Sequence, residues 1–197
     1  MFTGIITDLG RVRAVTQGAM TRLEIETRYA TESIAIGASI ACSGACLSVV
    51  ERGPGWFAVE ASAETLSKTT LGDWRAGAAV NLERPLTLGD ELGGHLVLGH
   101  VDGVGTVVER RPDGGSLRLT LETPADLARF IAPKGSVAID GVSMTVNDVA
   151  GRRFGVNVIP ITQRETTLGA LAAGARVNLE IDLLARYVAR LMAKDGE

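Results

Sequence analysis

The most reactive side chains of this 197-residue chain lie in two short segments. One segment carries the thiol of Cys46, and the other carries the carboxylate of Asp140 and the hydroxyls of Ser143 and Thr145. A thiol or an activated hydroxyl can act as a nucleophile, and a neighbouring carboxylate can orient the hydroxyl. Because Asp140 and Ser143 lie three residues apart across a glycine, a local bend would bring the two groups into contact. The spacing therefore predicts a serine oriented by an aspartate.

These residues also have purely structural interpretations. Asp140 could form an Asx turn at the end of a strand, with Ser143 buried and hydrogen-bonded. Cys46 could be a small buried apolar side chain, which is the commoner role of a lone cysteine. Cys42 lies four residues earlier, on the same face of an extended strand, and is interpreted as a packing residue. Both alternatives stay open from these residues alone.

The two histidines of the chain, His95 and His100, lie five residues apart. On a continuous strand an odd spacing points the side chains to opposite faces, which argues against a zinc pair. Either imidazole could transfer a proton near neutral pH. His100 is the better candidate, because internal alignment places it opposite Ile5, so that only one half of the chain has this histidine.

An internal repeat relates the two reactive segments. At an offset of 97, residues 37–83 align without a gap with residues 134–180 and are identical at 18 of 47 positions. A shorter match at an offset of 95 places Gly4 on Gly99. A long period that occurs only twice indicates a duplicated domain rather than a solenoid. We expect an N-terminal domain over residues 1–94 and a C-terminal domain over residues 95–185.

The elements predicted for each domain are short strands. Segments such as 21–27 and 116–122 alternate apolar and polar residues at period two and are separated by glycine-rich turns. Together with the duplication, this pattern predicts an all-β fold of two tandem, homologous domains, each a small closed or partly closed antiparallel barrel with short helices. Residues 183–192 instead place apolar residues at helical spacing, which predicts a C-terminal amphipathic helix within 183–197. This helix could pack on its own barrel or, as we favour, on a neighbouring subunit.

Composition excludes several classes of protein. The net charge of −3 and the pI near 5.5 argue against a nucleic-acid partner. The N-terminus lacks a basic region, and no apolar run reaches the length of a membrane span, so we expect neither a signal peptide nor a membrane partner. With two cysteines, a disulfide framework is not expected, and a cytoplasmic location is predicted. No phosphate-binding, dinucleotide-binding or metalloprotease motif occurs.

Several motifs, in order along the chain, resemble the riboflavin synthase alpha-chain family. They are Met-Phe-Thr-Gly-Ile at 1–5, Cys-Leu-Ser-Val at 46–49, Gly-Gly-His-Leu-Val-Leu-Gly-His-Val at 93–101, Asp-Gly-Val-Ser-Met-Thr-Val at 140–146, and Thr-Thr-Leu-Gly at 69–72 and 166–169. The family commonly has asparagine at position 43 and threonine at position 48, where this chain has Ser43 and Ser48. These conservative departures could alter affinity without indicating loss of function.

The resemblance implies a specific reaction and assembly. Two molecules of 6,7-dimethyl-8-ribityllumazine would be converted, by transfer of a four-carbon fragment, into riboflavin and 5-amino-6-ribitylaminouracil. No metal or organic cofactor would be needed. Each subunit would carry two lumazine-binding, six-stranded antiparallel Greek-key barrels and would form a homotrimer through the C-terminal helix. The resemblance also suggests an association with lumazine synthase.

Site residues carried over by position form two sets. The first pocket would comprise Gly4, Ile5, Ile6, Cys46, Leu47, Ser48, Glu60, Ala61, Ser62, Ala63, Glu64 and Thr65. The second would comprise Gly99, His100, Val101, Lys134, Ser143, Met144, Thr145, Asn157, Val158, Ile159, Pro160, Ile161 and Thr162. We expect His100 to transfer a proton, Asp140 to orient Ser143, and Cys46 and Thr145 to lie at the reacting faces. Phe2 is expected to shape a pocket, and Asp182 is a weaker polar candidate.

Two other functions compete with this interpretation. Relatives of the fold carry a bound lumazine or flavin without doing chemistry, so the chain could be a non-catalytic binding protein. That function predicts the loss of reactive groups from one half, whereas Cys46, His100, Asp140, Ser143 and Thr145 are all present. A purely structural pair of barrels would leave the difference between Cys46 and Ser143 unexplained.

Overall fold

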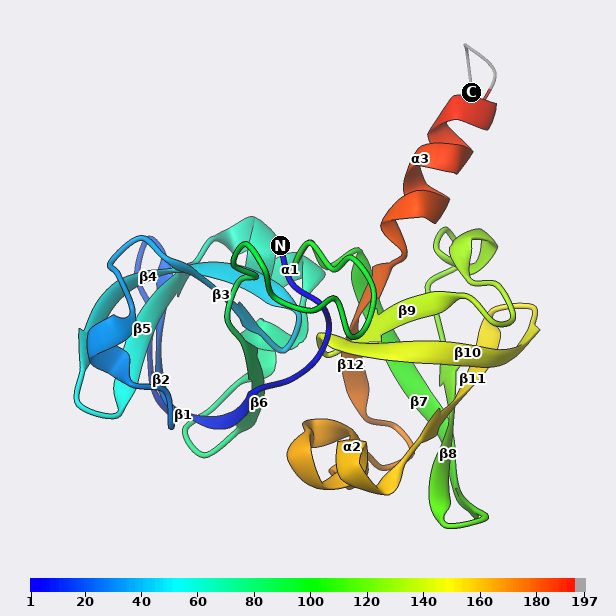
Figure 1. Cartoon of the computed structure of the whole chain (residues 1–197), viewed down its shortest axis with the longest axis horizontal. Coiled ribbons are helices and arrows are strands. Elements are labelled where there is room, and N and C mark those ends of the chain that lie inside the picture. Colours follow the sequence, from blue (N-terminus) through cyan, green and yellow to red (C-terminus); the bar gives the residue numbers. More distant parts are fainter. Residues whose placement is uncertain (194–197) are drawn as a thin grey trace.

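The computed structural model describes residues 1–193 and shows two closed β-barrels side by side (Figure 1). The first barrel has the strand order β1-β2-β5-β4-β3-β6, and the second has the order β10-β11-β8-β7-β12-β9. The strands are β1 (Asp8–Thr16), β2 (Thr21–Glu26), β3 (Ser39–Cys42), β4 (Ala45–Gly53), β5 (Trp56–Ala61), β6 (Ala79–Glu83), β7 (Gly103–Asp113), β8 (Ser116–Glu122), β9 (Ser136–Ile139), β10 (Val142–Ala150), β11 (Arg153–Val158) and β12 (Arg176–Ile181). All pairings are antiparallel, so the predicted pair of six-stranded barrels is confirmed.

Each barrel has its own apolar core, built from alternate residues of the strands. In β8, for example, Leu117, Leu119 and Leu121 are buried, while the residues between them are only partly covered. The pairing of β1 with β2 has a bulge near Val12, and the pairing of β7 with β8 has one near Val107. A bulge bends a strand and increases its twist, which helps a short sheet to close on itself. The repeated bulges show that both copies close in the same way.

The Thr-Thr-Leu-Gly motif of each half shapes the connection into the last strand of its barrel. Thr69 follows helix α1 (Ala63–Lys68), and Thr166 follows helix α2 (Pro160–Glu165). The hydroxyl of Thr69 donates to the carbonyl of Thr65 and accepts the N–H of Leu71, and Thr166 makes the same two kinds of hydrogen bond. Each threonine thus closes an α-helix and opens a 3₁₀ turn. Those turns are η2 (Thr70–Asp73) and η4 (Thr167–Ala170), while the other 3₁₀ turns are η1 (Thr31–Ser33) and η3 (Ala128–Phe130).

The C-terminal helix α3 (Leu183–Met192) projects away from both barrels (Figure 1). Asp182 caps it by accepting the N–H of Leu184, and Arg186 forms a 2.8 Å ion pair with Asp102. The helix is amphipathic, as predicted, although residues 194–197 of the expected 183–197 segment lie outside the described residues. Its apolar side chains Leu184, Tyr187, Val188 and Leu191 are all more than half exposed. The single chain therefore does not bury this face on its own barrel, which was one of the two expected alternatives.

Two asparagines at equivalent positions of the repeat join the barrels. Asn81 of β6 donates to the carbonyl of Asp140 and accepts the N–H of Thr167. Asn178 of β12 donates to the carbonyl of Ser43 and accepts the N–H of Thr70. Both side chains are buried, so these hydrogen bonds replace water completely. The contact between the barrels is therefore reciprocal, with one amide from each barrel reaching into the other.

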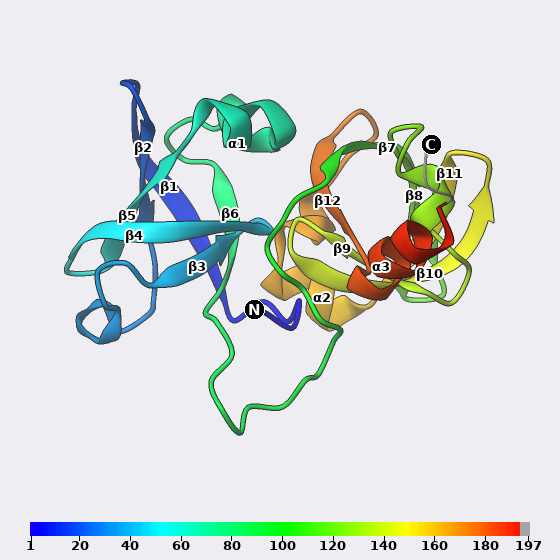
Figure 2. The ribbon, with the colours of Figure 1, turned by 90° about the horizontal axis from the view of Figure 1, so that it is seen from above.

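Two extended segments cross at the junction of the barrels, and we call them straps. The first strap is residues 2–6, and the second strap is residues 97–101. Phe2 and Val97 pair in an antiparallel bridge, with N–H···O distances of 2.7 and 3.1 Å, and both side chains are fully buried. Figure 2 shows the N-terminal segment and the connection between β6 and β7 lying at this junction. None of the described helices has the length and apolar character to cross a bilayer.

We predict that the substitution Asn178→Ala lowers the free energy of unfolding by about 2–4 kcal/mol, because it leaves a buried carbonyl and a buried N–H without partners. Chemical denaturation measures this loss. The control is Asp126→Ala, which removes an exposed side chain that makes no hydrogen bond or ion pair with the described residues and should cost less than about 0.5 kcal/mol. Equal effects of the two substitutions would contradict the role of Asn178 in joining the barrels.

Candidate functional site

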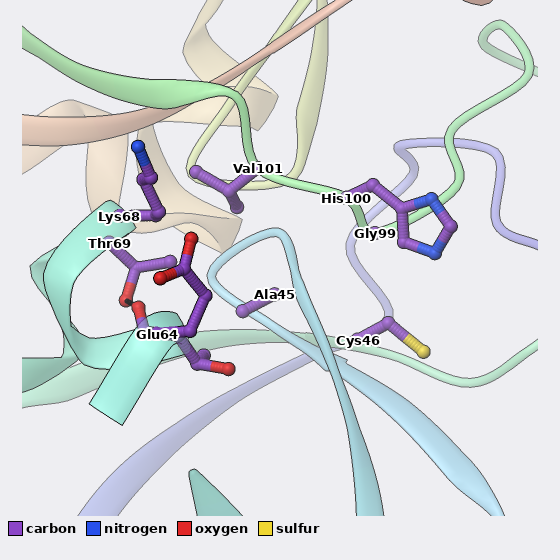
Figure 3. Close-up of a pocket in the computed structure, with 9 residues that line it drawn as sticks. Ala45, Cys46, Glu64, Lys68, Thr69, Gly99, His100 and Val101 are labelled. Carbon is purple, nitrogen blue, oxygen red and sulfur yellow. Dashed lines mark hydrogen bonds between the residues drawn. The ribbon is translucent and has the colours of Figure 1, made fainter. Parts of the chain in front are cut away.

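A cavity of about 280 Å³ lies on the first barrel, between β4, α1 and the second strap (Figure 3). Cys46 and His100 lie on one side of Ala45 and Val101, and Glu64 and Lys68 lie on the other. Nine residues line the cavity: Ala45, Cys46, Glu64, Thr65, Lys68, Thr69, Gly99, His100 and Val101. The structure thus brings a thiol and an imidazole from two distant segments to one cavity, which we call the first pocket.

The second strap completes this pocket through a close approach of two backbones. The N–H of Cys46 donates to the carbonyl of Gly99 at 2.8 Å. A Cβ atom on Gly99 would lie 2.5 Å from the Cβ of Cys46, and the φ of Gly99 is +79°. Only glycine combines this left-handed conformation with so little space. The Gly-His pair of the strap is therefore positioned against the strand that carries the thiol.

The first strap makes the equivalent contact on the second barrel. The N–H of Ser143 donates to the carbonyl of Gly4 at 2.8 Å. A Cβ atom on Gly4 would lie 2.6 Å from the Cβ of Ser143, and the φ of Gly4 is +76°. We call the surroundings of Ser143 the second pocket by analogy with the first, because the strap contact is repeated there and a hydroxyl replaces the thiol of Cys46. The two pockets share a backbone plan and differ in their reactive atom.

The straps are exchanged relative to the sequence prediction. Gly4, Ile5 and Ile6 were assigned to the pocket of Cys46, but Gly4 contacts Ser143 and Ile6 packs on the core of the second barrel. Gly99, His100 and Val101 were assigned to the pocket of Ser143, but they line the cavity of Cys46, and Val101 packs on the core of the first barrel. This part of the prediction is wrong, because the straps cross at the Phe2–Val97 bridge. The repeat relates equivalent positions but does not say which barrel each strap contacts.

His95 is a site residue that the sequence reasoning ranked below His100 and left out of both predicted pockets. Its Nδ1 lies 2.7 Å from the Oγ of Ser143. Burial lowers the pKa of His95, and the charge of Asp182 partly opposes this shift. A neutral imidazole can accept the hydroxyl proton of Ser143, so the pair has the geometry of a base and its hydroxyl partner. The odd spacing of His95 and His100 was the available signal, because it sends one imidazole to each pocket.

The predicted contact between Asp140 and Ser143 is wrong. The Oδ1 of Asp140 accepts the backbone N–H of Asn178 at 2.8 Å, and the hydroxyl of Ser143 pairs with His95 instead. The equivalent residue Ser43 accepts the N–H of Asn81 in the same way, at 3.2 Å. Asp140 and Ser43 therefore perform one structural task in the two copies, at a turn where both have positive φ angles. Burial raises the pKa of Asp140 to about 7.

Comparison with known proteins agrees with this plan of two equivalent pockets. Residues 3–85 and 98–182 each match the family model of the lumazine binding domain. This chain belongs to that family. The riboflavin synthase of Brucella abortus (strain 2308) is 54% identical over 199 residues, covering 97% of this chain and 98% of that protein. The riboflavin synthase of Mycobacterium tuberculosis (strain ATCC 25618 / H37Rv) is 44% identical over 203 residues, covering both chains completely.

Solved structures show the same architecture. The crystal structure of LumP complexed with riboflavin has a TM-score of 0.84 at 25% identity and covers 92% of this chain and 99% of that chain. LumP complexed with 6,7-dimethyl-8-(1'-D-ribityl) lumazine has a TM-score of 0.82 at 24% identity, with the same coverage, and supports the fold alone. The sequence-based resemblance to the riboflavin synthase family is confirmed by the curated relatives.

The other candidate residues of this lumazine-binding chain lie around the two pockets in different ways. Ser48 and Thr145 are exposed on the same strand faces as Cys46 and Ser143, whereas Leu47 and Met144 point into the cores. The amide of Asn157 is engaged by Arg118 and Asp113. The remaining candidates belong to three groups: Glu60, Ala61, Ser62 and Ala63 before and within α1; Val158, Ile159, Pro160, Ile161 and Thr162 before and within α2; and Lys134 at a turn with positive φ.

No cluster of three or more His, Cys, Asp or Glu side chains that could hold a metal ion occurs within residues 1–193. The histidines illustrate why. His95 faces Ser143 and His100 lines the cavity of Cys46, so the two imidazoles serve separate pockets.

The buried carboxyl of Asp140 predicts a pH dependence of stability. Its folded-state pKa of about 7 exceeds the ordinary value of 3.8, so its stabilisation is present below pH 3.8 and is lost as the pH rises through about 7. Asp140→Asn keeps a side-chain oxygen and removes the charge. The unfolding free energy of this variant minus that of the wild type should therefore rise by on the order of 2–4 kcal/mol as the pH is raised from about 5 to about 8. Denaturation at each pH measures this difference. The same difference in unfolding free energy between the variant and the wild type at both pH values would contradict the buried ionisation.

Proposed function

We propose that this chain is a riboflavin synthase, which converts two molecules of 6,7-dimethyl-8-ribityllumazine into riboflavin and 5-amino-6-ribitylaminouracil. The observation that carries the proposal is a pair of equivalent pockets with different reactive groups, Cys46 with His100 in one and Ser143 with His95 in the other. The curated relatives named riboflavin synthase match over nearly the whole chain, which supports the same activity. A protein that only stored two identical ligands would have no use for this difference.

The proposed reaction needs two different roles from two identical substrates. One lumazine loses a proton from its 7-methyl group, and the other accepts a nucleophile at C7. Holding the two rings face to face supplies much of the rate by positioning. His95 and Ser143 supply a neutral base and a hydroxyl in hydrogen-bond contact, which suits addition at C7 or removal of the methyl proton. His100 transfers a proton, while Cys46 and Thr145 lie at the reacting faces of the two pockets.

The proposal extends to assembly. Residues 1–94 and 95–185 are the two lumazine-binding units, and residues 183–197 are the assembly helix of a homotrimer. The exposed apolar face of α3 supports this role, because a face of Leu184, Tyr187, Val188 and Leu191 is suited to contact with another subunit. A monomer in sedimentation equilibrium would contradict it. A cytoplasmic location and an association with lumazine synthase remain predictions from the sequence.

The first experiment is incubation of the purified full-length protein with 6,7-dimethyl-8-ribityllumazine alone, with the products separated by chromatography. We expect riboflavin and 5-amino-6-ribitylaminouracil in equal amounts, without added metal or cofactor, because the reaction is a dismutation of one substrate. Tight binding without turnover would instead make the chain a lumazine-carrying protein and would remove the catalytic roles from the histidines and Ser143.

Single substitutions then test the individual roles in the same assay. We expect His95→Ala, His100→Ala and Ser143→Ala each to lower kcat by more than about tenfold, because each removes a proton-transfer group or its partner. The control is Ser116→Ala, which removes a hydroxyl at the start of β8 and should leave kcat unchanged. A loss smaller than tenfold in one of the three variants would exclude the role proposed for that residue.

A further inference from the structure

Two buried glutamates at equivalent positions of the repeat hold the two straps. Glu83 ends β6, and its Oε1 accepts the backbone N–H of Thr3 at 2.6 Å and the hydroxyl of Thr3 at 2.7 Å. Its Oε2 accepts the N–H of Gly4 at 2.9 Å. Three donors of the first strap thus converge on one carboxylate, whose residue is only 5% exposed.

Glu180 of β12 makes the corresponding contacts with the second strap. Its Oε1 accepts the N–H of Leu98 at 2.7 Å, and its Oε2 accepts the N–H of Gly99 at 2.9 Å. The residue is 4% exposed. Burial raises the pKa of both glutamates, and the strap N–H groups oppose this shift because they favour the ionised carboxylate. Each strap therefore has a single buried acceptor group for its adjacent N–H donors.

The barrel that anchors a strap is not the barrel whose pocket the strap completes. Glu83 belongs to the first barrel, but the carbonyl of Gly4 next to its contacts accepts the N–H of Ser143 in the second. Glu180 belongs to the second barrel, but the carbonyl of Gly99 accepts the N–H of Cys46 in the first. In both cases the same residue, a glycine, donates to the glutamate and accepts from the reactive strand of the opposite barrel.

We propose that Glu83 and Glu180 are positioning residues, each of which fixes a strap in the pocket of the opposite barrel. Glu180 controls how Gly99 and His100 lie against Cys46, and Glu83 controls how Gly4 lies against Ser143. Neither glutamate needs to touch a substrate for this. The inference deepens the proposed function and rests on it for any effect on turnover, but the placement of the straps can be measured without lumazine.

The thiol of Cys46 reports on the second strap in the full-length protein. Cys46 is half-buried beneath the strap, whereas Cys42 is fully buried and provides an internal check that the barrel is folded. Modification by iodoacetamide is followed for each cysteine by peptide mass spectrometry. We expect Glu180→Gln to raise the rate at Cys46 by about threefold or more, because a released strap opens locally, while Glu83→Gln leaves that rate within about twofold of wild type.

A second reporter gives the reciprocal measurement. The double substitution Cys46→Ser and Ser143→Cys moves the thiol to the equivalent position of the second barrel. In this background Glu83→Gln should raise the modification rate at position 143, and Glu180→Gln should not. The two glutamates are thus matched controls for each other, because their burial and hydrogen bonding are alike.

Three outcomes would overturn the proposal: unchanged thiol rates in both glutamine variants, an effect on the barrel that carries the substituted glutamate, or equal effects on both reporters. Modification of Cys42 would reveal general unfolding, in which case Glu83→Asp and Glu180→Asp, which keep the charge but shorten its reach, replace the glutamine variants under the same criteria. Lack of turnover by the wild type would contradict the proposed function and leave the thiol result standing. Full turnover with unchanged thiol rates would contradict the positioning role alone.

Discussion

Phe2 and Val97 pair through two backbone hydrogen bonds at the centre of the molecule, and the course of both straps toward the reactive strands depends on this bridge. Because the two straps meet there as antiparallel partners, each continues toward the opposite barrel. The outer face of a small barrel is open to solvent. The reactive face of β4 or β10 therefore becomes a pocket only when a further segment covers it. The bridge, together with the amides of Asn81 and Asn178, fixes the relative placement of the barrels that this exchange requires.

The same frame carries different chemistry in its two copies. The backbone contact between Cys46 and Gly99 has the same length as that between Ser143 and Gly4, so the difference between the pockets lies in side chains. Both imidazoles come from one connection: His95 reaches Ser143, and His100 lines the cavity of Cys46. The internal alignment gives His100 no histidine partner in the first half. Asymmetry between the pockets therefore arises from the β6–β7 connection as well as from the strands, and this suits a reaction that treats two identical substrates differently.

Buried polar groups in this fold mostly serve its geometry rather than its chemistry. The sequence predicts Asp140 as a catalytic partner because it lies near Ser143, yet it accepts the N–H of Asn178, as Ser43 does for Asn81. Desolvation makes an unpaired backbone N–H costly, so a buried turn with a positive φ angle needs an acceptor of this kind. Glu83 and Glu180 meet the same requirement for the straps. The reactive positions are instead those where a side chain faces outward from a strand beneath a strap.

The sequence alone determined the duplication, because residues 37–83 and residues 134–180 are identical at many positions. It also determined the all-β barrels and the amphipathic helix, because both follow from local periodicity. It also identified Cys46, His100 and Ser143 as the groups that could do chemistry. Only the tertiary structure decided which strap completes which pocket, that His95 is the partner of Ser143, and that Asp140 is structural. The physical reason is that a repeat offset identifies equivalent residues in the two copies, whereas contacts between the copies depend on how the two halves of the chain cross in space. That crossing is set by long-range backbone pairing, which leaves no periodic signal in the sequence.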